Sequence, residues 1–295
     1  MSSEAQARTL RSADGETLAL REWLGTPAAP VALVHITHGL GEHAGRYAHV
    51  ARRLNALGFA VRAHDHFGHG LSSGPRGGLP HGLRLLEDLA LLVDDGRAAF
   101  PGVPLVLMGH SMGGLVAASF VARGVRPVDA LVLSSPALSP TLSGAQKGLI
   151  AVLSRLAPGL RVGNGLDAKD LSHDPAVAPA YLNDPLNHDR IGARLARFLA
   201  DEGARVMQEA PRWPVPTLLL YAGADKLVRP EGSREFAAAA APGGMVRTIA
   251  FERHFHEIFN ELDAQPVFDA LEQWLVQRFG NSTVDQAPAS SAALA

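Results

Sequence analysis

Cysteine is absent from this sequence of 295 residues. Without it the chain can form no disulfide, thiolate nucleophile, iron–sulfur centre or cysteine-ligated zinc site. An excess of one charge is also missing, because 27 Lys and Arg stand against 29 Asp and Glu, a formal net charge of −2. The chain therefore lacks the positive field that nucleic-acid and acidic-membrane binders use. We expect a small-molecule ligand and no nucleic acid.

Long hydrophobic runs are missing as well. No apolar run approaches the roughly 18 residues that a membrane-spanning helix needs, and the longer ones, such as residues 218–223, have the length of a buried strand. Residues 1–17 mix both charges without the apolar stretch of a secretory signal, so we expect a cytoplasmic protein. Apolar side chains still make up 47% of the sequence, which excludes a disordered chain. Only residues 281–295, small and polar, are predicted to form a disordered tail.

Strand and helix patterns alternate along most of the chain. A stretch of alternating polarity at 17–23 follows a turn pair and predicts a hairpin strand. Continuous apolar runs with the length of buried strands lie at 31–36, 59–63, 105–108, 128–133, 217–221 and 246–251. Helical patterns closed by Gly or Pro lie at 46–57, 83–100, 112–123 and 263–279. Such repeated units predict an α/β protein with a mostly parallel sheet and helices on both faces.

The alternation stops in the middle of the chain. Between residues 136 and 214 we predict no strand, whereas the stretches 145–156 and 190–207 carry apolar residues at helical spacing. We therefore divide the chain into a core of residues 1–135 and 215–280 and an inserted helical cap of residues 136–214. Such an insertion lies over the carboxyl ends of the strands, where open α/β sheets bind ligands.

A first catalytic signal is the sequence GHSMG at residues 109–113, a pattern that is weak by itself and gains weight from its context. It lies between an apolar run and a helical pattern, where a tight strand-to-helix turn would expose Ser111. Such a turn leaves no room for side chains two residues before and after the serine, which explains Gly109 and Gly113. We expect Ser111 to be a nucleophile. The alternative is an ordinary glycine-rich turn in which the serine only caps the helix.

A serine hydroxyl attacks well only when a base takes its proton and a carboxylate orients that base. After a turn of this kind the three residues follow in the order serine, acid, histidine. Asp225 follows the apolar run at 217–221, and His256 follows the last run. We predict these two as the acid and the base. Two alternatives stay open: Asp225 as a turn-forming residue only, and His254 as the base.

Acyl transfer also needs amide donors aimed at the oxygen that becomes negatively charged. One expected donor is the N–H of Met112, directly after the serine. The other is expected in the loop after the run at 31–36. There Gly39 and Gly41 flank Leu40 and would let its N–H approach a substrate closely.

Two other ligand chemistries compete for these segments. Gly39, Gly41 and Gly45 follow a predicted strand and could cradle a dinucleotide, but their spacing departs from the pattern G-x-G-x-x-G. The histidines of residues 64–72 suggest a metal site, yet they show no known ligand spacing. We therefore predict no cofactor and no metal, and we expect these polar groups to bond each other and the backbone behind the site.

Three sequence blocks and two single positions together resemble a known family. The blocks are HGLGEHAGRY at 38–47, HDHFGHGLS at 64–72 and GHSMGG at 109–114, and the positions are those around Asp225 and His256. They resemble the α/β-hydrolase family of monoacylglycerol lipases and lysophospholipase-like esterases. The resemblance extends from about residue 17 to residue 279, and the three blocks together are far more specific than any one of them.

The resemblance implies an α/β-hydrolase fold with Ser111, Asp225 and His256 as the catalytic triad and Leu40 and Met112 as oxyanion donors. It implies a serine hydrolase that cleaves carboxylic esters through an acyl-enzyme, with single-chain lipid esters such as monoacylglycerols as substrates. The alternatives are a lysophospholipase, a small-ester carboxylesterase or thioesterase, an amidase or peptidase, and a binding module without turnover.

The cap would shape the pockets for the acyl chain and the alcohol, and it is where a transient membrane contact could form. Its apolar side chains could line an acyl tunnel or pack onto the core. They are Leu149, Ile150, Val152, Leu153, Leu195, Phe198 and Leu199.

Overall fold

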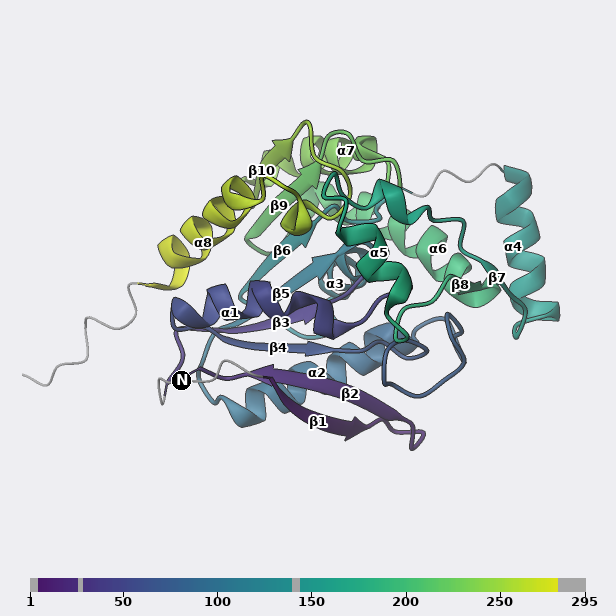
Figure 1. Ribbon diagram of the computed structural model, residues 1–295, viewed down its shortest axis with the longest axis horizontal. Coiled ribbons are helices and arrows are strands. Elements are labelled where there is room, and N and C mark those ends of the chain that lie inside the picture. The colour runs from purple at the N-terminus through teal and green to yellow at the C-terminus, as the bar shows by residue number, and fades with distance from the viewer. Residues whose placement is uncertain (1–4, 26–28, 140–143, 281–295) are drawn as a thin grey trace, which may run out of the picture.

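A computed structural model describes residues 5–25, 29–139 and 144–280 (Figure 1). The tail predicted for residues 281–295 lies outside these ranges. One large sheet runs through the molecule with helices packed against it, and a second group of helices and strands lies beside it (Figure 1).

The large sheet has eight strands in the order β1-β2-β4-β3-β5-β6-β9-β10. β2 pairs antiparallel with β1 and β4, and every other pair is parallel, so the predicted mostly parallel sheet is confirmed. The inner strands are buried on both faces, which is why they read as continuous apolar runs in the sequence. The strands are β1 (Gln6–Arg11), β2 (Thr17–Trp23), β3 (Leu33–Thr37), β4 (Ala60–His64), β5 (Leu105–His110), β6 (Ala130–Ser134), β9 (Thr217–Ala222) and β10 (Val246–Phe251).

Helices cover both faces of this sheet, as predicted. One face carries α1 (Ala48–Ala56) and α8 (Gln265–Phe279), and the other carries α2 (Arg84–Ala99), α3 (Ser111–Ala122) and α7 (Pro230–Ala240). Short 3-10 turns join the elements at η1 (Ala44–Tyr47), η2 (Ala168–Asp170), η3 (Ala210–Arg212), η4 (Ala241–Gly243) and η5 (Ile258–Asn260).

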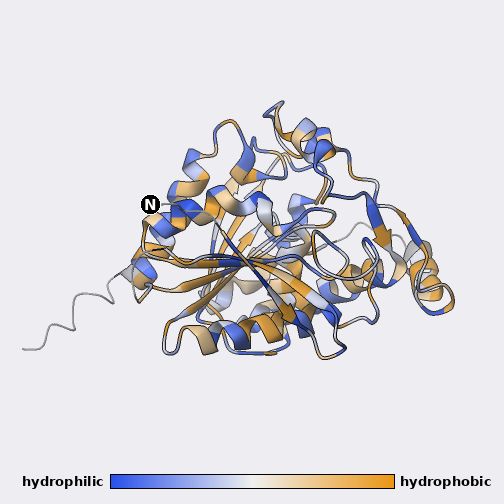
Figure 2. Ribbon diagram, turned by 60° about the horizontal axis from the view of Figure 1, so that its bottom comes forward, coloured by the Kyte–Doolittle hydropathy of each residue, from blue (hydrophilic) through white to orange (hydrophobic). Residues whose placement is uncertain are grey.

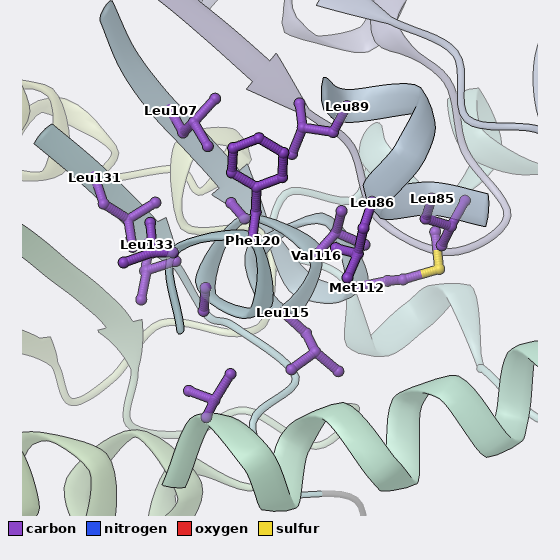
Figure 3. Close-up of a cluster of buried hydrophobic side chains, with 14 of the residues drawn as sticks. Leu85, Leu86, Leu89, Leu107, Met112, Leu115, Val116, Phe120, Leu131 and Leu133 are labelled. Atoms are coloured by element: carbon purple, nitrogen blue, oxygen red, sulfur yellow. The ribbon is translucent and has the colours of Figure 1, made fainter. Parts of the chain in front are cut away.

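The hydrophobic core is divided by the sheet into two clusters. Side chains alternate along each strand, so Leu107 of β5 faces α2 and α3, whereas its neighbour Val106 faces α1 and α8. Figure 3 shows the first cluster, where Phe120 of α3 lies between Leu107 and Leu89. Apolar residues follow the strands through the middle of the molecule (Figure 2). This two-sided packing fixes the ends of the strands, where the site lies.

The segment between β6 and β9 contains the elements predicted as a cap. They are α4 (Gly144–Leu156), β7 (Arg161–Gly163), α5 (Val177–Asn183), β8 (Arg190–Gly192) and α6 (Ala193–Glu209). The expectation of no strand here was wrong, because β7 and β8 pair antiparallel. These strands are three residues long, and all three residues of β7 are exposed, so no burial pattern marked it in the sequence. β8 takes up the first residues of the predicted helix at 190–207, which begins at Ala193.

Helix α6 is anchored on helix α3. The hydroxyl of Ser119 donates to the buried carboxylate of Glu202, and Arg123 bonds the same carboxylate at 2.7 Å. The helix that begins at Ser111 and the longest helix of the inserted segment are thereby linked. In the described part of the chain, no helix combines the length and the apolar character needed to cross a lipid bilayer.

Candidate active site

Ser111 lies at the sharp turn between β5 and α3. Its φ of 53° falls in the left-handed region, which costs a residue with a side chain of order 1–3 kcal/mol. The turn needs its glycines, because a Cβ on Gly109 would collide with the carbonyl of Gly113, and one on Gly113 would collide with the carbonyl of Thr37. This geometry is the one expected from the sequence GHSMG, and it leaves the side chain of Ser111 partly accessible at the end of the sheet.

Asp225 and His256 come together through a charge-assisted hydrogen bond. His256 Nδ1 and Asp225 Oδ2 are 2.7 Å apart, and both side chains are buried. The second oxygen, Asp225 Oδ1, accepts the backbone N–H groups of Leu227 and Val228 at 2.9 Å each. Asp225 therefore both shapes its turn and orients the histidine. Because the carboxylate can only accept, His256 carries its hydrogen on Nδ1 and leaves Nε2 free as a base.

Electrostatics at this pair favour the protonated imidazole. Burial lowers the pKa of His256, but the adjacent Asp225 carboxylate, with help from Glu257 and Glu42, raises it above its ordinary value. The alternative base, His254, instead bonds the carbonyl of Asp263. It is not among the residues that line the cavities at Ser111.

Ser111 and His256 line two cavities that share this wall. The larger, of about 700 Å³, is bordered by apolar side chains that include Met112, Ile191 and Leu199 and by charged ones such as Lys226 and Glu231. The smaller, of about 80 Å³, is bordered by several leucine side chains as well as by the polar groups of His110, Asn164, Tyr181, Asp189 and Glu257. The serine therefore lies between a large recess and a small one, and both combine apolar and polar side chains.

The loop after β3 supplies a free amide beside the serine. A Cβ on Gly39 would come within 3.2 Å of Ser111 Cβ, so this loop touches the turn. The Gly39 N–H donates to Glu42 Oε1 at 2.6 Å, whereas no acceptor takes the Leu40 N–H among the residues that the structure describes. The Met112 N–H belongs to the first turn of α3, where helical N–H groups have no intrahelical partner. Both predicted oxyanion donors thus lie next to Ser111.

A buried polar network that the sequence did not reveal supports this loop. Glu42 accepts from Tyr47 at 2.8 Å and from Arg46 at 2.7 Å, and Arg46 also forms two hydrogen bonds to Glu257. Burial would raise the pKa of Glu42, but Arg46, together with His110, His38 and the Tyr47 hydroxyl, lowers it to about 2. The i,i+4 pair Glu42 and Arg46 could have been read from the sequence. Its partner Glu257 could not, because it lies 211 residues further along the chain from Arg46.

The histidines of residues 64–72 bond each other and the backbone, as expected. His64 Nε2 lies 3.2 Å from His66 Nδ1, and the ring of His66 bonds the carbonyl of His38. Burial lowers the pKa of His64, His66 and His69 well below its ordinary value, so these rings are neutral. Within residues 5–25, 29–139 and 144–280, no three His, Asp or Glu side chains are grouped as metal ligands.

Residues 28–263 match the model of a protein family described as serine aminopeptidase, S33. The chain belongs to this family. This S33 member is 38% identical to the monoacylglycerol lipase of Mycolicibacterium smegmatis over 251 residues, which cover 84% of this chain and 89% of that protein. An uncharacterised abhydrolase domain-containing protein of Dictyostelium discoideum is 33% identical over 96% of this chain, and the chain spans 30% of that relative's length.

A solved structure extends the comparison to three dimensions. The monoacylglycerol lipase of Paleococcus ferrophilus superposes on this S33 member with a TM-score of 0.79 and 35% identity, covering 88% of this chain and 99% of that chain. The α/β-hydrolase fold and the family that the sequence blocks resemble are thereby confirmed.

Proposed function

We propose that this protein is a serine hydrolase of carboxylic esters, with single-chain lipid esters of the monoacylglycerol type as its substrates. One observation carries the proposal: the cavity that exposes Ser111 also exposes His256, whose Nδ1 is bound by the buried Asp225. Two relatives named as monoacylglycerol lipases, from M. smegmatis and P. ferrophilus, support the ester class.

In the first half of the reaction, Ser111 Oγ attacks the ester carbonyl carbon and His256 Nε2 takes the hydroxyl proton. The carbonyl oxygen becomes an oxyanion that the N–H groups of Leu40 and Met112 stabilise. Asp225 stabilises the imidazolium at 2.7 Å. When the carbon–oxygen bond breaks, His256 returns the proton to the leaving alcohol, and the acyl group stays on Ser111.

In the second half, a water molecule takes the place of the alcohol. His256 Nε2 removes its proton as it attacks the acyl carbon, and the same two N–H groups hold the second oxyanion. Collapse of this intermediate frees the carboxylic acid and returns the proton to Ser111 Oγ. Besides the substrate and this water molecule, both halves use only groups of the chain.

The two cavities suggest where each part of the substrate lies. We assign the acyl chain to the larger recess, where Leu199 of α6 and Ile191 of β8 form part of the wall. We assign the alcohol to the smaller recess with its amide, hydroxyl and carboxylate groups. The apolar side chains that the sequence offered for an acyl tunnel fall into three groups: those that border the larger recess, those buried in the core and those that face outward. Leu199 borders it, Leu195 and Phe198 are buried in the core cluster, and Leu149 and Val152 face outward.

Helix α4 offers an apolar face for a transient membrane contact. Leu149, Val152 and Leu156 are 57%, 51% and 81% exposed, and their spacing places them along one side of the helix. Such a face can insert at the boundary of headgroups and acyl chains. Leu156→Glu should weaken flotation with phosphatidylcholine vesicles, whereas Leu262→Glu, at an exposed leucine outside α4, should not. The cytoplasm remains the compartment predicted from the sequence, which cell fractionation would test.

The substrate class is tested with purified protein. Values of kcat/KM for p-nitrophenyl esters of two to sixteen carbons should rise with chain length, because each buried methylene contributes up to about 0.8 kcal/mol. 1-Monoacylglycerol, lysophosphatidylcholine and triacylglycerol are then compared. A maximum at two carbons with no cleavage of monoacylglycerol would reject the lipid substrate, and a preference for the lysophospholipid would identify the neighbouring activity.

A further inference from the structure

We propose that His38 is a positioning residue for the oxyanion site: its Nδ1–H holds the Gly39–Leu40 peptide so that the Leu40 N–H points at the reacting carbonyl. The inference rests on the proposed function, because it assigns a task to a side chain behind the catalytic loop. His38 is fully buried and does not border either cavity at Ser111.

The geometry of one peptide group carries the first step. His38 Nδ1 lies 2.7 Å from the carbonyl oxygen of Gly39. That oxygen and the Leu40 N–H belong to the same peptide unit, which is trans, so they point in opposite directions. A donor that fixes the oxygen therefore also fixes the direction of the N–H. It also polarises the amide, which strengthens the hydrogen bond on the other side.

The backbone determines which nitrogen of His38 carries the hydrogen. The N–H of His66 donates to His38 Nε2 at 2.9 Å. A backbone N–H can only donate, so Nε2 must be unprotonated and the hydrogen of the neutral ring must be on Nδ1. Protonation of both nitrogens would break this bond. Burial lowers the pKa of His38 to about 4, which agrees with a neutral ring.

A chain of further imidazoles holds His66 in place. The ring Nε2 of His66 bonds the carbonyl of His38 at 3.1 Å, so it is a donor and its Nδ1 is an acceptor. His64 Nε2 then donates to His66 Nδ1, and His35 Nε2 donates to His64 Nδ1 at 2.9 Å. Every proton in this chain has one allowed position. The chain starts at His35 of β3 and ends at the carbonyl of His38. The backbone N–H of His66 and the ring of His38 connect it to the carbonyl of Gly39.

Two conservative variants separate this role from simple packing. In His38→Asn, the nitrogen of the new side-chain amide can occupy the place of Nδ1 and keep the bond to Gly39. In His38→Gln, the longer side chain instead places its amide near Nε2, where it can still accept from His66. Both replacements are neutral and smaller than imidazole, so both weaken the packing. Only His38→Gln loses the donor to the Gly39 carbonyl.

The experiment measures kcat and KM of the full chain with a p-nitrophenyl ester, and the rate of labelling by a fluorophosphonate. Removal of one oxyanion donor costs about 10²- to 10³-fold in kcat, so a misdirected donor should cost roughly 10- to 100-fold. We expect that loss in kcat and in the labelling rate for His38→Gln, with little change in KM, and near wild-type kcat for His38→Asn. Equal kcat in the two variants would overturn the inference.

A measurement on the unaltered protein covers the case in which the variants do not fold. ¹⁵N NMR of the histidine rings should show His38 protonated on Nδ1 and unprotonated on Nε2 at neutral pH. The opposite tautomer would overturn the inference. Failure of the proposed function is recognised separately, because the wild-type protein would then show no ester turnover and no labelling of Ser111.

Discussion

Replacement of Asp225 by Asn is a sharp test of the serine–histidine–aspartate arrangement, because the structure dictates how the new amide must lie. The backbone N–H groups of Leu227 and Val228 need an acceptor at the position of Oδ1. The amide oxygen must therefore take that place, and the NH₂ group must face His256 Nδ1 at the position now 2.7 Å away.

A donor at that position reverses the tautomer of the histidine. His256 Nδ1 would have to accept, so the ring hydrogen would move to Nε2, which could no longer take the proton of Ser111. The pKa of His256 would also fall, because burial still lowers it while the Asp225 carboxylate that raises it is gone. We expect kcat to fall about 10⁴-fold, which corresponds to about 5.5 kcal/mol in activation free energy.

The assay is steady-state hydrolysis of a p-nitrophenyl ester, with thermal unfolding as a check on the fold. Asp94→Asn is a matched control, because this carboxylate forms an exposed ion pair with Arg126 on the surface and should leave kcat unchanged. A folded Asp225→Asn protein that keeps kcat within about tenfold of the wild-type value would refute the assigned role of Asp225.

The histidine, the serine turn and the larger recess each give a further test. The kcat/KM of the wild-type protein should rise with pH through a midpoint above 6.5, the ordinary pKa of histidine, because the pKa of His256 is raised. Below the midpoint its imidazole is protonated and cannot act as a base. A kcat/KM that stays constant between about pH 5 and 8 would contradict this role of His256. Gly113→Ala should lower the free energy of unfolding by about 1–3 kcal/mol, because its Cβ would collide with the Thr37 carbonyl. Gly148→Ala is the matched control, because its new Cβ would meet no atom within 4 Å. This substitution should stabilise helix α4 by up to about 1 kcal/mol, and denaturant titrations compare the free energies of unfolding of the two variants. Leu199→Trp should shift the preferred p-nitrophenyl ester to shorter chains by filling the larger recess, and an unchanged profile would remove the acyl chain from it.

The sheet could be predicted from the sequence where burial on both faces forces a continuous apolar run, as at Leu105 to Met108 of β5. Strand β1 lies at the edge with most of its residues exposed, so the polar sequence at Gln6–Arg11 contained no such signal. Strands β7 and β8 were missed because three residues are too few to show a period.

Part of the site could be predicted because some of its residues occur in short, local sequence patterns. The turn around Ser111 needs glycines at fixed spacing, and Asp225 and His256 each follow a strand that the apolar runs reveal. Contacts between distant segments leave no such trace, so the bonds from Arg46 to Glu257 were missed. For the same reason, Leu195 and Leu149 both occur in apolar patterns with helical spacing, and these patterns could not show how the two helices pack. In the structure Leu195 is buried and Leu149 faces solvent.

The most direct test of the central claim is the site of covalent modification by a fluorophosphonate. The protein is incubated with the probe, digested, and examined by mass spectrometry alongside Ser111→Ala. We predict one added phosphonyl group on the peptide that contains Ser111 and a loss of ester hydrolysis in proportion to labelling. Folded Ser111→Ala should not be labelled, and its residual kcat should be at most roughly 10⁻⁴ of the wild-type value. Modification at another residue, or ester hydrolysis at the wild-type rate in Ser111→Ala, would contradict the account.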